Sequence, residues 1–260
     1  TEFASRATEH RRPLLAMEVL SRNGLGARAA DRAAVIAEAM LAALKADERT
    51  PTSLSGWSVG RLLDLLEEAG TDLNTMVTLE LGFEEVTHFD RPPRALHGAM
   101  LAQPSLFVEA VTSTYRPDDG SESAEATETE RQRAGVLYSV LTSLKALPGA
   151  REDGTIDQRA LTAWVAQARS ALAESHRAKI GDHCIGEVLS SSPVGDDGVW
   201  PAEAVRDLIE TIASPDLESG MQVGHYNARG ITSRSPYEGG VQEEALVDQF
   251  REGAERLAGC

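Results

Sequence analysis

The sequence predicts an all-α protein, and three observations lead to this expectation. Apolar residues recur at helical spacing in one segment after another, and none of these segments alternates apolar and polar residues as a half-buried strand does. Proline, glycine and capping residues separate the segments at short intervals. Aromatic residues form only 5% of the 260 residues, so aliphatic and small side chains must fill the core. We therefore expect an α-solenoid of stacked helical hairpins, with an irregular multi-helix bundle as the alternative.

The first part of the chain, residues 1–116, is expected to form an array of short helical hairpins. Its clearest apolar stripe comprises Val35, Ile36, Ala39, Met40, Ala43 and Leu44. Ser58 and Asp72 are of the residue types that cap helix N-termini, so we expect each of them to start a helix. Pro92-Pro93 then breaks the helical pattern before two more short helices.

Residues 117–130 have a different composition from the helical segments. They contain no large apolar residue, and their acidic residues are Asp118, Asp119, Glu122, Glu125, Glu128 and Glu130. Such a segment cannot bury enough apolar surface to fold by itself, so we expect a flexible acidic loop. An acidic docking tail is the functional alternative, but solvated loops are the commoner case.

The last part of the chain, residues 131–260, is expected to form a second helical array with a loop rich in glycine and arginine. Its expected helix starts are Arg131, Asp157, Gly181-Asp182, Pro201, Ser214-Pro215 and Gln242. Gly220 and Gly224 lie one turn apart on the same helix face. Close packing of another helix is the expected reason for these two glycines, and a ligand contact is the alternative.

Two segments of this part can be aligned as an internal repeat. Glu152 to Asp157 aligns with Asp196 to Pro201, which places Gly154 on Gly198. The apolar stripes that follow then coincide, with Leu161, Trp164, Val165 and Ala168 falling on Val205, Leu208, Ile209 and Ile212. The offset is about the length of a two-helix solenoid unit, which favours the solenoid over the bundle.

The first copy of this repeat also resembles the middle of a calcium-binding loop. In that alignment Gly149, Arg151 and Ala160 occupy positions that require oxygen ligands, so we exclude calcium. A glycine turn that leads into a helix capped by Asp157 explains the same residues. We expect no metal site and no cofactor, and no nucleotide-binding GxxxxGK[ST] motif is present in the sequence.

Composition limits the partners and the compartment. The net charge of −16 argues against binding to nucleic acid and to anionic membranes, and no apolar run is long enough for a membrane span. The two cysteines, Cys184 and Cys260, form no CxxC pair, which indicates a reducing, cytoplasmic compartment. The ends look like cuts within a longer chain, and the Ala, Arg and Gly usage suggests a bacterial source.

The best candidate recognition surface is the loop that contains Asn227, Arg229, Arg234 and Tyr237. Two guanidinium groups beside an amide, a phenol and several glycines can clamp a carboxylate or phosphate. Internal ion pairs between these arginines and the preceding acidic helix are the structural alternative, which we favour. A small-anion sensor at Arg229 and Arg234 therefore stays a rival hypothesis.

A second rival is an enzyme that uses His183, Cys184 or His225 near this loop. His183 and Cys184 are adjacent, so on a helix their side chains point about 100° apart and do not readily share a ligand. A buried structural cysteine and a surface histidine explain them more simply. We therefore expect no catalytic residue among them.

Several short motifs also carry a resemblance to a known group of proteins. They are Arg-Pro-Pro-Arg-Ala-Leu-His at 91–97, Phe-Val-Glu at 107–109, Glu-Asp-Gly-Thr-Ile-Asp, Ile-Gly-Glu-Val-Leu, Asp-Gly-Val-Trp-Pro and Asn-Ala-Arg-Gly-Ile-Thr-Ser-Arg. Together they resemble the C-terminal helical region of large bacterial multidomain proteins, some similar to the STAND-type NTPases of defence systems. The resemblance implies a helical-repeat module attached to an effector or ATPase. We therefore expect a non-catalytic module that binds a protein partner or neighbouring domains of its own chain.

Overall fold

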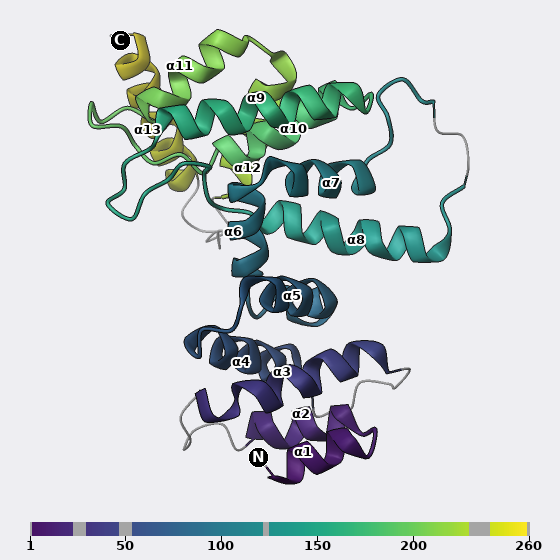
Figure 1. Ribbon diagram of the computed structural model, residues 1–260. Coiled ribbons are helices and arrows are strands. Elements are labelled where there is room, and N and C mark those ends of the chain that lie inside the picture. Colours follow the sequence, from purple (N-terminus) through teal and green to yellow (C-terminus); the bar gives the residue numbers. More distant parts are fainter. Residues whose placement is uncertain (1, 23–29, 47–53, 122–124, 229–239, 259–260) are drawn as a thin grey trace. The chain divides into compact units, whose positions relative to one another are not determined.

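The computed structural model describes residues 2–22, 30–46, 54–121, 125–228 and 240–258, and within these ranges the chain is all-α (Figure 1). The described residues form thirteen α-helices, and their only β-type pairing is an isolated bridge between Ala150 and Ile156. This confirms the predicted fold class. None of the described helices is both long enough and apolar enough to cross a membrane.

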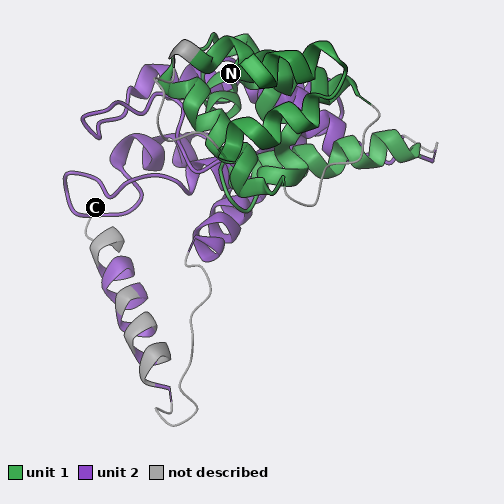
Figure 2. Cartoon of the chain, turned by 90° about the horizontal axis from the view of Figure 1, so that it is seen from below, with its two compact units in different colours: residues 1–102, 126–143 green, residues 103–125, 144–260 purple. Residues whose placement is uncertain are grey.

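The chain divides into two compact units, which Figure 2 distinguishes by colour. Unit 1 consists of residues 1–102 and 126–143, and unit 2 of residues 103–125 and 144–260. Unit 1 contains α1 (Glu2–Glu9), α2 (Pro13–Arg22), α3 (Ala30–Lys45), α4 (Gly56–Glu68), α5 (Leu73–Thr87), α6 (Arg94–Ala102) and α8 (Glu128–Ser143). Unit 2 contains α7 (Pro104–Thr114), α9 (Gln158–Glu174), α10 (Ala178–Leu189), α11 (Glu203–Ile212), α12 (Pro215–Asn227) and α13 (Val241–Ala258).

These units do not follow the expected division of the chain at residues 116 and 131. Helix α7 belongs to unit 2, where the fully buried Phe107 lies against Trp164 of α9 with ring centroids 5.0 Å apart. Helix α8 belongs to unit 1, where the Ser139 hydroxyl donates a hydrogen bond to Glu84 of α5 at 2.9 Å. The unit to which α7 and α8 each belong is therefore decided by packing against helices distant in sequence.

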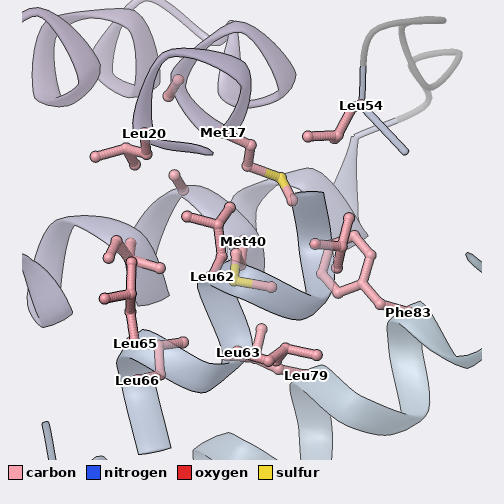
Figure 3. Packing of buried hydrophobic residues seen from close by; sticks show 14 of the residues in the cluster. Met17, Leu20, Met40, Leu54, Leu62, Leu63, Leu65, Leu66, Leu79 and Phe83 are labelled. Carbon is pink, nitrogen blue, oxygen red and sulfur yellow. The ribbon is translucent and has the colours of Figure 1, made fainter. Parts of the chain in front are cut away.

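The core of unit 1 is built mainly from leucine, methionine and alanine (Figure 3). Ile36, Ala39 and Met40 of the predicted stripe on α3 have no exposed surface. Leucines of α4 and α5 pack with them, among them Leu62, Leu63, Leu66 and Leu79. Each buried side chain of this kind stabilises the folded state by about 1.5–3 kcal/mol. The shared core therefore holds together helices that are too short to be stable alone.

Helix N-termini in unit 1 match the sequence prediction at one position and differ at another. Asp72 caps α5 as expected, because its carboxylate accepts a hydrogen bond from the Thr75 amide at 2.9 Å. The prediction that Ser58 caps α4 is wrong, since Ser55 is the N-cap and Gly56 begins the helix. A Cβ at Gly56 would overlap the Val86 carbonyl oxygen, so only glycine lets α4 start this close to the end of α5.

A buried arginine joins α4, α5 and the segment that precedes α6. The Arg91 guanidinium, 4% exposed, donates to Asp64 at 2.8 Å, to Glu67 at 2.8 Å and to Glu80 at 2.6 Å. Glu80 also accepts the Leu96 amide of α6 at 2.9 Å. Three carboxylates around one guanidinium offset the cost of burying these charges, and they raise the pKa of Arg91 although burial alone opposes its charge.

Helices α10 and α12 of unit 2 pack through glycines that allow their backbones to touch. A Cβ at Gly220 would overlap the His183 carbonyl oxygen, and a Cβ at Gly224 would overlap the Ser190 side chain. On α10, Gly186 faces the Leu217 carbonyl oxygen in the same way. This confirms that close helix packing explains Gly220 and Gly224.

The start of α10 differs from the prediction that Gly181-Asp182 caps it. The helix begins at Ala178, and Asp182 lies buried within it, where it accepts hydrogen bonds from Arg169 at 2.7 Å and from Ser214 at 2.6 Å. The Asp118 carboxylate instead accepts the Lys179 amide of the first turn at 2.7 Å. The beginning of the acidic segment is therefore anchored to α10.

The two copies of the predicted repeat form turns with the same hydrogen bonds. The Arg151 amide donates to the Thr155 carbonyl at 2.9 Å, and the corresponding Gly195 amide donates to the Val199 carbonyl at 2.8 Å. Gly154 and Gly198 both have positive φ, 84° and 75°. The alignment therefore matches two turns with the same backbone conformation, and each turn has a glycine at the position with left-handed φ.

Candidate functional site

The predicted recognition loop lies mostly outside the described residues. Arg229, Arg234 and Tyr237 fall within residues 229–239, so their contacts stay untested. Asn227 is described, and it is an exposed residue at the C-terminal end of α12. The clamp of two guanidinium groups remains a prediction.

The cysteine candidate lies in surroundings that do not favour nucleophilic chemistry, and His225 lies among aromatic rings. Cys184 is 3% exposed, and burial, with a smaller contribution from the negative charge of Glu187, raises the pKa of its thiol to about 12. A thiol with that pKa is protonated at neutral pH, whereas the thiolate is the reactive form. The His225 ring lies 4.3 Å from the Trp200 ring and 6.3 Å from the Phe250 ring, in an aromatic cluster.

The carboxylates of the turn between α8 and α9 are engaged within the chain. Asp153 accepts the Thr155 amide at 2.9 Å, and Asp157 accepts the Ala160 amide of α9 at 3.1 Å and the Arg151 guanidinium at 2.7 Å. Asp157 therefore caps α9 as predicted. Across the described ranges, no cluster of three or more His, Cys, Asp or Glu residues could hold a metal ion.

The site that the structure does offer is a groove in unit 1 between α3 and the start of α5. Its volume is about 660 Å³. Helix α3 lines it with Ala33, Ala34, Ala37, Glu38, Leu41, Ala42 and Lys45, and the other wall is Thr71, Asp72 and Thr75. We call this feature the α3–α5 groove. Its lining is mainly apolar, and its charged residues are Glu38, Lys45 and Asp72.

Helices α3 and α5 touch beyond one end of the groove. Leu44 of α3 packs on Gly82 of α5, where an added Cβ would lie 2.6 Å from the leucine Cδ1 atom. Asp72 lies ten residues before Gly82, about 15 Å away along α5 at the rise of an α-helix. Of the alanines that line the groove, Ala34 is exposed, whereas Ala33, Ala37 and Ala42 are partly buried.

The composition of α3 contains a signal for this groove that sequence reasoning missed. The predicted stripe omits Ala33, Ala37 and Leu41, which continue the apolar surface around the helix and are partly buried against the same core. Between Arg32 and Lys45 the only charged residue is Glu38. A helix that is apolar on most of its circumference is normally buried on both sides, so a second partner was to be expected.

A smaller hollow of about 280 Å³ adjoins the groove at Thr71, which lines both. Its charged groups, Glu67 and Arg94, pair with each other at 3.0 Å. Leu73, at 52% exposed, also lines this hollow. The hollow therefore extends the surface around the turn between α4 and α5 without adding an unengaged charge of its own.

No protein-family model, curated protein or solved structure matches this chain. The functional conclusion therefore rests on the geometry and the chemistry of the chain itself.

Proposed function

We propose that this chain is a non-catalytic helical module that recognises a protein partner, or a neighbouring domain of a longer chain, through the α3–α5 groove. The observation that carries the proposal is the groove itself. Four alanines and Leu41 line it, and Ala34 is exposed while the other four are partly accessible. Apolar side chains left accessible between two helices favour contact with another surface, because leaving them in water is unfavourable.

The chemistry of the described residues supports a binding role over a catalytic one. The buried thiol of Cys184 is protonated at neutral pH. The carboxylates Asp153, Asp157 and Asp182 are bound to backbone amides, arginines or Ser214. These groups are therefore engaged in holding unit 2 together.

The wider setting of the module is part of the same proposal. Stacked helical hairpins present long surfaces to partners, which is the role we assign to the array of α1 to α5. The net charge of −16 disfavours nucleic acid as the partner. A cytoplasmic bacterial protein of the defence type, with its effector or NTPase elsewhere, is the parent chain that the motif resemblance implies.

Site-specific photo-crosslinking tests this proposal. A benzophenone amino acid is placed at Ala34, which is exposed on the groove wall, and at Ala163, which is exposed on α9 in unit 2. In the cells that naturally make the protein, the Ala34 probe is expected to give one dominant protein adduct, and the Ala163 probe is not. Substitution of Ala37 by Arg, which places a bulky charge in the groove, should abolish the adduct while the circular dichroism spectrum is retained.

Equal adduct patterns from the two positions would contradict a recognition role for the groove. An adduct that persists in the Ala37→Arg variant would contradict it as well, because contact would then not depend on the groove floor.

A further inference from the structure

We propose that α8 is a detachable helix of unit 1, and that ionisation of Glu84, the buried carboxylate of α5 that bonds to α8, promotes its release. This device is separate from the α3–α5 groove and does not depend on the proposed function. Three observations carry it: the place of α8 in the chain, the hydrogen bonds that attach it, and the surroundings of Glu84.

Helix α8 belongs to unit 1 through packing and not through its chain neighbours. Residues 126–143 contain α8, whereas residues 103–125 before them and 144–260 after them belong to unit 2. The hydrophobic core of unit 1, part of which Figure 3 shows, is formed by residues between Ala4 and Ala95 and includes no described residue of α8. This core can therefore persist when α8 leaves, which is the condition for a local opening that costs less than global unfolding.

Two buried ionisable side chains bond to α8. The Ser139 hydroxyl of α8 donates a hydrogen bond to Glu84 of α5 at 2.9 Å, and the His97 ring of α6 donates from Nε2 to the Val140 carbonyl at 3.0 Å. Glu84 is 1% exposed and His97 is 9% exposed. The attachment of α8 therefore depends on side chains that can gain or lose a proton.

Glu84 is poorly compensated for a buried carboxylate. Its Oε1 atom accepts the Ser139 hydroxyl, and its buried Oε2 atom has no hydrogen-bond partner among the described residues. Two titratable groups of α5 act on it: His88 favours its ionised form, and Glu80 opposes it. The Arg91 guanidinium donates to Glu80 at 2.6 Å. Burial is the largest influence and raises the pKa of Glu84, so the docked form keeps a proton that an exposed carboxylate releases.

Proton binding is thereby linked to the docking of α8. Water reaches Glu84 when α8 leaves α5, so in the detached form this carboxylate titrates near its ordinary pKa of 4.5. The contribution of Glu84 to docking is therefore complete below pH 4.5 and is lost as the pH rises through the raised pKa. His97 acts in the opposite sense, because burial lowers its pKa and docking weakens as the pH falls below 6.5.

Hydrogen–deuterium exchange of the full chain tests this device, measured by mass spectrometry and corrected for the intrinsic exchange rate at each pH. In the wild type, amides in the middle of α8 are expected to exchange about tenfold faster than those of α4 in the core, because α8 opens alone. In the variant Glu84→Gln, opening of α8 should be about threefold to tenfold rarer than in the wild type at neutral pH, the factor that corresponds to half to one unit of pKa. This ratio should approach one below pH 4.5, and His97, present in both proteins, cancels from it.

The matched control is Glu68→Gln, which removes a carboxylate at an exposed position of α4 and should keep the wild-type exchange of α8 at every pH. Equal protection of α8 and α4 in the wild type would overturn the inference, since α8 would then leave only when the whole unit unfolds. A ratio between Glu84→Gln and wild type that does not change with pH would overturn it as well, because release would then not follow the ionisation of Glu84.

Discussion

Two helix pairs in this protein use small residues to opposite effect. In unit 2, glycines on α10 and α12 bring the two backbones into contact, and Gly220 lies directly against the His183 carbonyl. In unit 1, alanines on α3 line a groove of about 660 Å³ whose far wall is the start of α5. The comparison teaches that a stripe of small residues indicates close approach of a helix but does not say whether that helix is in the same chain.

The largest effect on stability is expected at the glycine contact between α10 and α12. The change Gly220→Ala should lower the free energy of unfolding of unit 2 by about 2–3 kcal/mol, because an added Cβ overlaps backbone atoms that cannot move aside. The control is Gly135→Ala on α8, where the described residues place no atom outside the helix's own backbone within 4 Å of the added Cβ. There the better helix propensity of alanine should stabilise by up to about 1 kcal/mol.

Urea denaturation of the two variants checks this prediction. A Gly220→Ala protein as stable as the wild type would remove the contrast between the two helix pairs, since α10 and α12 would then also have room between them.

A medium effect is expected on the other side of α5, where α8 packs through polar groups. Glu84 is 1% exposed, its Oε1 atom accepts the Ser139 hydroxyl, and its Oε2 atom has no hydrogen-bond partner among the described residues. Burial disfavours the charged form and raises the pKa of Glu84 above its ordinary value of 4.5. The folded state therefore holds the proton more tightly than the unfolded state, and stability falls as pH rises from 4.5 through the folded pKa.

The change Glu84→Gln removes this loss. The variant should be more stable than the wild type by about 1 kcal/mol at neutral pH, the cost of one poorly satisfied buried group, and equal to it below pH 4.5. Melting temperatures across this pH range measure the difference. The exposed neighbour Glu85→Gln is the control and should keep the wild-type pH profile; a Glu84→Gln advantage that does not depend on pH would contradict the assigned cause.

The smallest effect on stability is expected in the groove itself. The change Ala34→Leu adds a side chain to exposed surface, so the free energy of unfolding should change by less than about 0.5 kcal/mol. The same change at Ala39, which is fully buried on the opposite face of α3, should destabilise by about 1–3 kcal/mol through overpacking. Chemical denaturation of both variants compares the two faces, and equal losses would mean that the groove face is packed as tightly as the core.

Local signals in the sequence predicted most of the helices and several of their starts. Asp72, Asp157 and Ser214 cap helices as expected, since each accepts an amide two or three residues ahead in the chain. The N-cap prediction for Ser58 was wrong because Ser55, three residues earlier, has the same side chain and Gly56 fits against α5. The N-cap prediction for Asp182 was wrong for another reason. Its hydrogen-bond partners, Arg169 and Ser214, are 13 and 32 residues away, so a local sequence pattern does not reveal them.

The candidate site was less predictable than the fold. The sequence directed attention to Asn227, Arg229, Arg234 and Tyr237, of which the structure describes only Asn227. The groove forms where α3 meets the turn at Thr71, and no spacing within either segment reveals that meeting. The capping of α10 by Asp118 was missed in the same way, because about sixty residues separate the carboxylate from the amides that it binds.

The sequence by itself determined the all-α fold, the buried face of α3, and the glycine turns at Gly154 and Gly198. These features depend on the period of apolar residues and on backbone preferences, which act between near neighbours. Only the tertiary structure decided that α8 packs on α5, that Asp182 is a buried tie rather than a cap, and that the alanines of α3 face an open groove. Those outcomes depend on which distant segments come together, and that choice is made by the packing of the whole unit.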